Sequence, residues 1–149
     1  MINDWGGNIL SQSYILTKFM FGHNLVIGKG VVFTLELIEK DKVQQLLNNY
    51  ENKEVYVHLE TTNGAYASHF GNKGINVGAY IRNAKLTYTN AVIEGDTGFR
   101  VGLNTQLGWV YGEGLTHYEL YENEKLLLAG HDDEGRLMVA LQISETPFK

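Results

Sequence analysis

The segment that decides the fold is VYVHLETTNGAYASHF, residues 55–70. From Val55 to Leu59, apolar residues alternate with polar or aromatic ones, which is the two-residue period of a half-buried β-strand. Asn63-Gly64 follows, a dipeptide typical of a two-residue hairpin turn because both central positions of that turn adopt positive φ angles. We therefore predict an antiparallel hairpin in which His58 lies directly opposite His69.

The same two-residue period continues to the end of the chain. Short segments rich in aliphatic and aromatic residues are separated by turn-forming clusters such as Gly95-Asp96-Thr97-Gly98 and Asp132-Asp133-Glu134-Gly135. Short strands joined in this way predict a mainly β domain, an antiparallel β-sandwich or open barrel. The further strands that we expect are 75–82, 85–94, 99–103, 108–121, 126–131 and 136–144.

One short helix is predicted before these strands. Asp41 and Gln44 have the spacing of a capping box, with Asp41 as the N-cap and Gln44 reaching back to it. The apolar residues that follow recur at helical spacing and form one stripe over about three turns. The members of this stripe are Val43, Leu46, Leu47 and Tyr50.

Composition excludes several classes of protein. The net charge of −5 provides no basic field for a phosphate backbone, so we expect no nucleic-acid partner. The absence of cysteine excludes a disulfide framework, a thiolate metal site and a cysteine nucleophile. The apolar stretch 14–33 is interrupted by Lys18, His23 and Lys29, so it predicts no membrane span, and no secretion signal is recognisable at the start. We expect a cytoplasmic protein.

Six stretches of the chain are specific in combination: VYVHLETTNGAY at 55–66, AYIRNAK at 79–85, FRVGL at 99–103, GWVYGEGLT at 108–116, LLLAGH at 126–131 and LQISETPF at 141–148. Together they resemble the YojF family of uncharacterised bacterial proteins. The resemblance implies a β-sandwich that is dimeric, and a genomic neighbour that is a metal-dependent deacetylase of bacillithiol synthesis. It supplies no catalytic residues.

The resemblance divides the chain in two. It covers residues 35–149, whereas residues 1–34 contain several glycines and no sustained helical or strand period. We interpret residues 1–34 as an extension translated from sequence upstream of the native start codon. The alternative is a genuine N-terminal arm. The mass of the intact protein from its native host would separate the two interpretations.

One polar group in the first hairpin is a candidate metal site. If Asn63-Gly64 is a two-residue turn, His58 and His69 face each other and Glu60 lies two residues along on the same side. Two imidazoles and a carboxylate could bind Zn²⁺ or Fe²⁺ and leave coordination positions for water or substrate. The alternative is that these are ordinary polar residues on the solvent face of a hairpin, and a bulge would move His58 out of line.

Two later segments bear on packing and on assembly. Trp109, Tyr111 and Leu115 share one face of a predicted strand, and we expect that face in the core; an aromatic-lined ligand cavity is the alternative. The hairpin 126–143 carries apolar residues on both faces, which both need covering. We expect a second sheet to cover one face and either the helix or a second subunit to cover the other, which favours a homodimer.

Two functions therefore remain open. The sequence has no Gly-rich phosphate loop, no Gly-x-Ser-x-Gly elbow and no His-Glu-x-x-His helix. This favours a non-catalytic binding or accessory module, with the deacetylase that the resemblance implies as its partner. The alternative is a small metalloenzyme that uses His58, Glu60 and His69 as ligands and a bound water as nucleophile.

Overall fold

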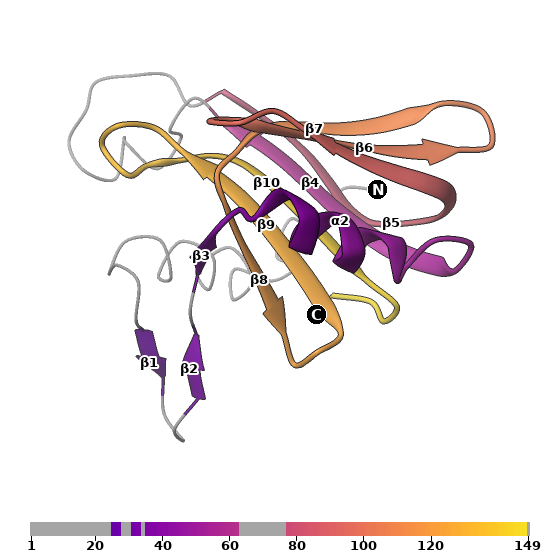
Figure 1. Cartoon of the computed structure of the whole chain (residues 1–149), viewed down its shortest axis with the longest axis horizontal. Helices are drawn as coiled ribbons and strands as arrows, with labels where there is room; N and C mark the ends of the chain where they lie inside the picture. Colours follow the sequence, from indigo (N-terminus) through magenta and orange to yellow (C-terminus); the bar gives the residue numbers. More distant parts are fainter. Residues whose placement is uncertain (1–24, 28–30, 34, 63–76, 149) are drawn as a thin grey trace, which may run out of the picture.

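A computed structural model describes residues 25–27, 31–33, 35–62 and 77–148 of the chain. Its main body is one eight-stranded antiparallel sheet with the strand order β3-β8-β9-β10-β4-β5-β6-β7, and a separate two-stranded sheet pairs β1 with β2 (Figure 1). The elements are β1 (Leu25–Ile27), β2 (Val31–Phe33), β3 (Glu36–Leu37), α2 (Lys40–Asn48), β4 (Glu54–Thr62), β5 (Gly78–Glu94), β6 (Phe99–Thr105), β7 (Trp109–Leu115), β8 (His117–Tyr121), β9 (Lys125–His131) and β10 (Leu137–Ser144).

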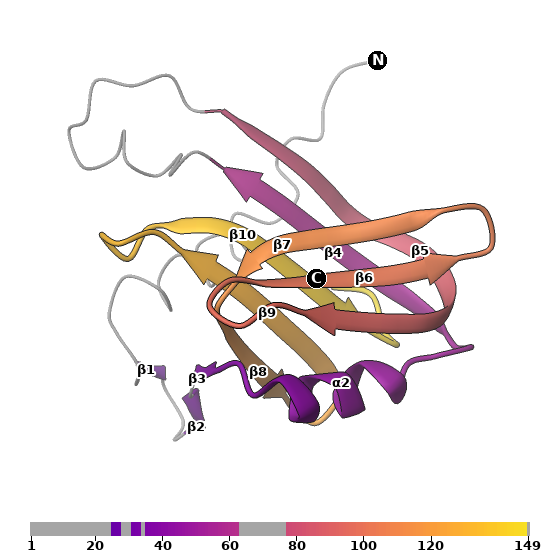
Figure 2. The same cartoon turned by 45° about the horizontal axis from the view of Figure 1, so that its top comes forward.

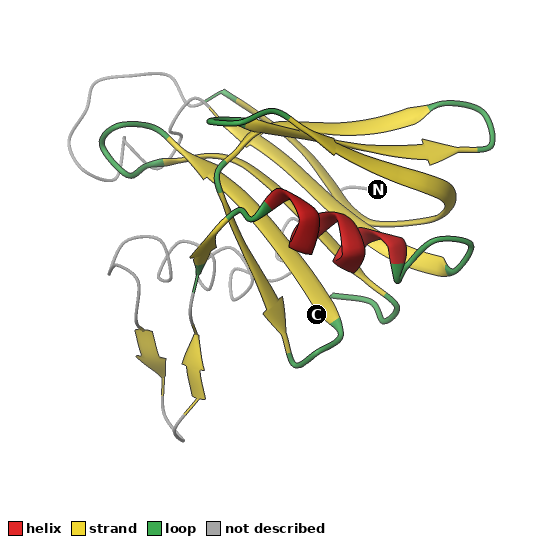
Figure 3. Ribbon diagram, in the orientation of Figure 1, coloured by secondary structure: helices red, strands yellow, loops and turns green. Residues whose placement is uncertain are grey.

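The predicted fold class is confirmed. The large sheet curls so that the β6–β7 hairpin lies over the other strands, giving a half-barrel with one short helix beside it (Figures 2 and 3). The core lies inside the curl, where β4, β6, β9 and β10 contribute fully buried aliphatic side chains. The long strand β5 serves both halves of the curl, since residues 78–87 pair with β4 and residues 88–94 pair with β6.

Glycines allow β7 to close over the opposite strands. A side chain on Gly130 of β9 would collide with the backbone oxygen of Gly114 of β7, so the two strands touch through their backbones. Gly112 of β7 similarly lies against Leu141 of β10, whose Cβ would be 3.4 Å from a Cβ at residue 112. Larger residues at Gly130 would separate the two strands and open the core.

Helix α2 packs on the core, but its start differs from the prediction. The N-cap is Glu39 and makes no side-chain capping bond, so the predicted capping box of Asp41 and Gln44 is wrong. Gln44 instead bonds to β5: its Nε2 donates to Ala91 O at 2.8 Å, and its Oε1 accepts from Ile93 N at 3.0 Å. The Gln44 side chain thus satisfies backbone groups of β5 beyond Glu54, the first residue of β4. At these residues β5 would otherwise have a free edge.

The strand predictions are correct in kind and wrong in two boundaries. In the described residues, the predicted strands 75–82 and 85–94 belong to the single strand β5, because Asn83 continues it with φ of 50° at a bulge rather than ending it; residues 75 and 76 lie outside the described residues. The predicted strand 108–121 is two strands, β7 and β8, separated at Thr116. Thr116 leaves the β7 pairing with β6 and bonds instead to Ala129 O of β9 at 2.8 Å.

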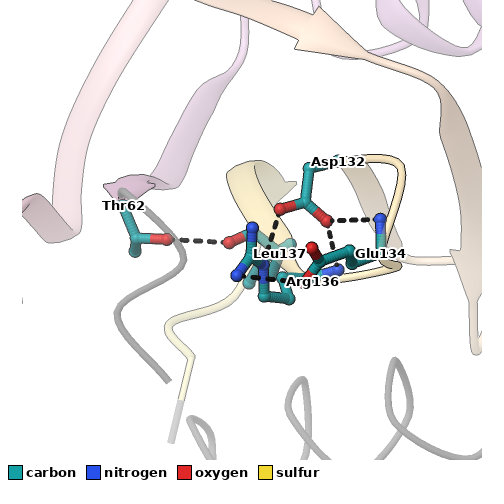
Figure 4. Close-up of polar contacts among 5 residues, drawn as sticks. All are labelled: Thr62, Asp132, Glu134, Arg136 and Leu137. Atoms are coloured by element: carbon teal, nitrogen blue, oxygen red, sulfur yellow. Dashed lines mark hydrogen bonds and ion pairs between the residues drawn. The ribbon is translucent and has the colours of Figure 1, made fainter. Parts of the chain in front are cut away.

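The turn between β9 and β10 is built around Asp132. Its Oδ1 accepts hydrogen bonds from the backbone N–H groups of Glu134 and Arg136, and its Oδ2 accepts one from Arg136 Nε at 2.6 Å (Figure 4). Thr62, the last residue of β4, donates to Leu137 O at 2.7 Å. These contacts hold the start of β10 beside the end of β4.

The expected covering of the last hairpin is only partly correct. Leu126, Leu128, Val139, Leu141 and Ile143 share the face that is buried in the main core, whereas Leu137, which the two-residue period places with them, lies on the other face beyond the bulge between Leu137 and Val139. Helix α2 packs on this same core, so it does not cover the opposite face of the hairpin. On that opposite face, Ala129, Ala140 and Leu137 form a second small buried cluster, beside polar residues such as Gln142.

Candidate binding face

The structure places His58 and Glu60 on one face of β4, as predicted, but not in the predicted pairing. At His58, one edge of β4 carries β10, with Gln142 as the partner, and the other edge carries β5. The prediction that His58 pairs with His69 across a two-residue turn is therefore wrong, because both edges of β4 have other partners. His69 and the Asn63-Gly64 turn lie outside the described residues.

His58 is held by a structural network. Its Nδ1 accepts a hydrogen bond from the backbone N–H of Asn83 at 2.9 Å, so the neutral ring carries its proton on Nε2. The Phe148 ring packs against the imidazole with centroids 4.4 Å apart. Burial, reinforced by the positive charge of Arg82, lowers the pKa of His58 to about 4. The ring is therefore neutral at physiological pH.

Glu60 lies in a filled region of the same face. Its Oε2 is 4.0 Å from the Arg82 guanidinium, which in turn lies over the Tyr80 ring at 5.5 Å. The space between His58, Glu60 and Arg82 is about 10 Å³, scarcely room for one water. Within residues 35–62 and 77–148, no three His, Asp or Glu side chains are grouped to hold a metal ion. The predicted metal set of His58, Glu60 and His69 remains a prediction.

A group of exposed aromatic residues lies elsewhere, on β5, β6 and β7. Cross-strand pairing arranges nine residues there in three rows, with one residue of each strand in each row. We call this surface the aromatic face. Its rows are Asn90, Asn104 and Trp109; Val92, Gly102 and Tyr111; and Glu94, Arg100 and Glu113.

Two parallel rings dominate the aromatic face. The Trp109 and Tyr111 rings are 5.6 Å apart with an angle of 10° between their planes, and the two residues are 46% and 51% exposed. Both rings lean over Gly102, where a Cβ atom would lie 2.8 Å from Tyr111 Cε1 and 3.2 Å from Trp109 Cε3. A hollow of about 180 Å³ also lies on this face, lined by Val92, Glu94, Arg100, Gly102, Trp109 and Tyr111.

The polar residues of this face are largely engaged with one another. Arg100 donates to both carboxylate oxygens of Glu113, at 2.9 and 2.8 Å, and its guanidinium lies 5.8 Å from the Tyr111 ring. Asn104 donates to the Asn90 side chain at 3.0 Å. An arginine, a tyrosine and a tryptophan therefore stand side by side on a rigid sheet, held by their neighbours. These are the residue types that dominate binding energy in protein interfaces.

The expectation that Trp109 and Tyr111 lie in the core is wrong, whereas that for Leu115 is confirmed. Gly114 has φ of 86°, and the pairing of β6 with β7 shifts by one residue between Phe99 and Arg100. This irregularity reverses the alternation, so Leu115 points into the core while Trp109 and Tyr111 point outward. The two glycines in Tyr111-Gly112-Glu113-Gly114 are the sequence signal that a bulge interrupts this strand.

Comparison with known proteins places the chain in a family. A family model described as a protein of unknown function (DUF1806) matches residues 37–148. The chain belongs to this family. Its relative YojF from Bacillus subtilis (strain 168), an uncharacterized protein, is 51% identical over 114 residues, which are 76% of this chain and 98% of YojF.

The fold of the family has also been solved. The crystal structure of Bacillus subtilis YojF is similar with a TM-score of 0.66 and 48% sequence identity, covering 77% of this chain and 97% of that one. The resemblance to the YojF family predicted from the sequence is thus confirmed. Members of DUF1806 have no assigned activity, so a function for this chain is inferred from its own surfaces.

Proposed function

We propose that this YojF-family chain is a non-catalytic binding module that docks a partner protein on the aromatic face. The observation that supports the proposal is the exposure of Trp109 and Tyr111, about half of each, beside the bidentate pair of Arg100 and Glu113. Large aromatic side chains bury much apolar area on binding and lose little conformational entropy, so they bind partners well. Exposed groups of such side chains often mark interaction sites. Leu107, in the turn before β7, is a further exposed apolar residue close in sequence to Trp109.

Binding is favoured over catalysis by the shape and chemistry of this face. Its hollow of about 180 Å³ is smaller than the pockets that enclose substrates, and it suits a single anchoring side chain of a partner. The cation of Arg100 is already paired with Glu113, so it is not poised to activate a substrate. A rigid sheet with a central aromatic anchor and a charged rim is the usual anatomy of a docking surface.

The candidate partner is the deacetylase of bacillithiol synthesis that the family resemblance implies. The test is surface-immobilised binding of that enzyme to the full chain and to the double variant Trp109→Ala/Tyr111→Ala. Loss of both rings should weaken binding by about 100-fold or more, as expected for two anchor residues. Leu37→Ala is the matched control, because Leu37 is exposed at the far edge of the sheet. Equal binding by all three proteins would reject the aromatic face as the docking surface.

We also propose that the chain forms a homodimer through the outer edge of β5. In the described part of the chain, β6 pairs with β5 only from Tyr88 onward, so residues 79–87 have a partner strand on one side only. Tyr80 and Ile81 on this stretch are 45% and 47% exposed. Antiparallel pairing of two such edges about a two-fold axis would bury both residues and satisfy the free backbone groups.

Light scattering tests the dimer directly. The full chain should have twice the mass of one copy, and Ile81→Lys should give single copies because a charge cannot be buried at the two-fold axis. Leu107→Lys, in the turn before β7, should leave the mass unchanged. A single-copy mass for the unmodified chain, or dimers of Ile81→Lys, would refute this interface.

A cytoplasmic location is part of the same proposal. No helix in the described ranges is long and apolar enough to cross a membrane. Fractionation of native cells with an antibody to the chain would test the compartment: recovery in the washed membrane fraction would refute it.

A further inference from the structure

A second surface feature, distant from the aromatic face in the strand order, is a cavity at the end of α2. Its volume is about 370 Å³, which lies within the range of small-molecule sites. The end of α2, the turn between β8 and β9 and the end of β10 come together around it (Figure 1). The lining residues are Leu46, Asn49, Tyr50, Lys53, Leu120, Asn123, Glu124, Glu145 and Thr146.

Apolar and acidic side chains both line the cavity. Leu46 is partly buried and packs on the core, and Leu120 of β8 also lines the cavity. Two carboxylates, Glu124 and Glu145, line the cavity with one ammonium group, that of Lys53. Lys53 Nζ lies 2.8 Å from Glu145 Oε1, whereas Glu124 has no ion-pair partner among the residues that the structure describes. Among the described residues that line the cavity, carboxylates therefore outnumber ammonium groups by two to one.

The backbone adds to this negative field. Helix α2 ends at Asn48 with no basic residue in its last turn, so the partial negative charge of its C-terminus is not offset there. Tyr50, in the cavity wall, donates its hydroxyl to Glu124 O at 3.0 Å. Burial raises the pKa of Tyr50 to about 12, and the negative charges of Glu145 and Glu124 add to this effect. Tyr50 therefore stays protonated and uncharged, and the negative groups beside it, the two carboxylates and the C-terminus of α2, favour a cation in the cavity.

We infer that this cavity binds a small organic ammonium compound. The ammonium group lies between Glu124 and Glu145, and the aliphatic part lies on Leu46 and Leu120. Lys53 already places its own ammonium on Glu145, which marks the position that the ligand's ammonium takes. Asn49 and Asn123 are placed to orient further polar atoms of the ligand.

The substitution Lys53→Met separates this inference from its opposite. It removes the resident cation and frees Glu145, so an ammonium compound should bind more tightly. If the cavity instead held an anion on Lys53, the same substitution would abolish binding. Lys85→Met is the matched control, because Lys85 forms a similar exposed ion pair with Glu54 at 2.9 Å, outside the cavity. Exposed pairs of this kind contribute little to stability, so both variants should fold.

The experiment is a titration of the full chain with n-butylammonium, n-butyrate and 1-butanol, followed by the backbone amide NMR signals of Asn49 and Asn123. Butylammonium alone should shift these signals, with millimolar affinity that tightens on the order of threefold in Lys53→Met. Glu124→Gln and Glu145→Gln should each weaken it by about tenfold. Lys85→Met should change nothing. The inference would be overturned if butyrate or butanol shifted these signals as much as butylammonium does. It would also be overturned if butylammonium gave no shift, or if it bound more weakly to Lys53→Met. The Trp109 indole signal should stay unmoved, so the outcome is independent of the docking proposal.

Discussion

Asn83 and Phe148 are joined by two hydrogen bonds. Asn83 Oδ1 accepts from the Phe148 backbone N–H at 2.8 Å, and Asn83 Nδ2 donates to the Phe148 carbonyl at 2.8 Å. The Asn83 carboxamide therefore pairs with the N–H and C=O groups of Phe148 as a neighbouring strand would. The backbone N–H of Asn83 also donates to His58 Nδ1, so the bulge in β5 connects β4, β5 and the C-terminal segment.

Replacing Asn83 should separate the contribution of its side-chain hydrogen bonds from that of its positive φ angle. Asn83→Gly keeps the positive φ of 50° but loses both side-chain bonds, so unfolding free energy should fall by about 1–2 kcal/mol. Asn83→Ala also strains the backbone, so it should cost about 1 kcal/mol more. Urea unfolding measures both. Asn90→Ala is the control, since Asn90 has only an exposed side-chain bond to Asn104. Equal loss in all three variants would contradict the role of the bulge.

His58 should make stability depend on pH. Its pKa is about 4 in the folded chain and about 6.5 when unfolded, so the unfolded state binds more protons between these values. The contribution of His58 to the unfolding free energy is therefore fully present above pH 6.5 and is lost as the pH decreases toward 4. Below pH 4 this residue causes no further loss. The loss is up to about 3 kcal/mol.

His58→Gln should flatten the pH dependence of unfolding free energy between pH 6.5 and 4. The glutamine does not titrate, although it also loses the ring contact with Phe148, so its stability at pH 7.5 should be lower. The control is His117→Gln, which removes a different imidazole. A variant of His58 whose pH profile has the same slope as the original would show that His58 is not the group responsible.

Gln44 should stabilise the part of β5 that extends beyond its pairing with β4, residues 88–94. Gln44→Met keeps the length of the side chain but removes its bonds to Ala91 and Ile93, so unfolding free energy should fall by about 2 kcal/mol. Gln45→Met is a matched control on the exposed side of the same helix. Hydrogen exchange should show faster exchange of the Ile93 amide only in the first variant. Protection unchanged at Ile93 would contradict the edge role.

Gly102 should be required for the aromatic face. In Gly102→Ala the new methyl group would lie 2.8 Å from Tyr111 and 3.2 Å from Trp109, so both rings must move. The indole NMR signal of Trp109 should shift, and binding of the proposed partner should weaken by about tenfold. Gly108→Ala adds a methyl group into open space nearby and should change neither. An unmoved indole signal in Gly102→Ala would count against the packing described.

The metalloenzyme alternative predicts stoichiometric Zn²⁺ or Fe²⁺ held by His58, Glu60 and His69. Metal analysis of protein purified without a histidine tag tests it. On this alternative, His58→Ala should lose the metal, whereas His117→Ala should retain it. Sub-stoichiometric metal that is unaffected by either substitution would end the proposal.

Much of the fold is predictable from residue period and turn chemistry, because these signals are local. The strands β4, β9 and β10 were predicted within about two residues, since their apolar residues alternate regularly and their turns carry Gly or Asp. The boundaries that failed lie at Asn83 and Thr116. There the pairing with a distant strand decides whether the chain continues or ends, and a local pattern does not contain that information.

The candidate site was less predictable for the same reason. Placing His58 and Glu60 on one face of β4 needed only the two-residue period, and this prediction is confirmed. Their surroundings depend on β10, which follows in sequence by about 80 residues, and on the bulge at Asn83. The exposure of Trp109 depends on the single shift in register near Gly114, which reverses both faces of β7. A one-residue irregularity thus decides which side chains of β7 are buried and which are exposed.

The long strand β5 also constrains how this protein loses its structure. Its first ten residues belong to one half of the curl and its last seven to the other, because residues 78–87 pair with β4 and residues 88–94 with β6. Neither half retains its central strand if the other melts. The domain should therefore denature in one cooperative transition, and a chain divided between Thr87 and Tyr88 should yield two fragments that fold only when mixed.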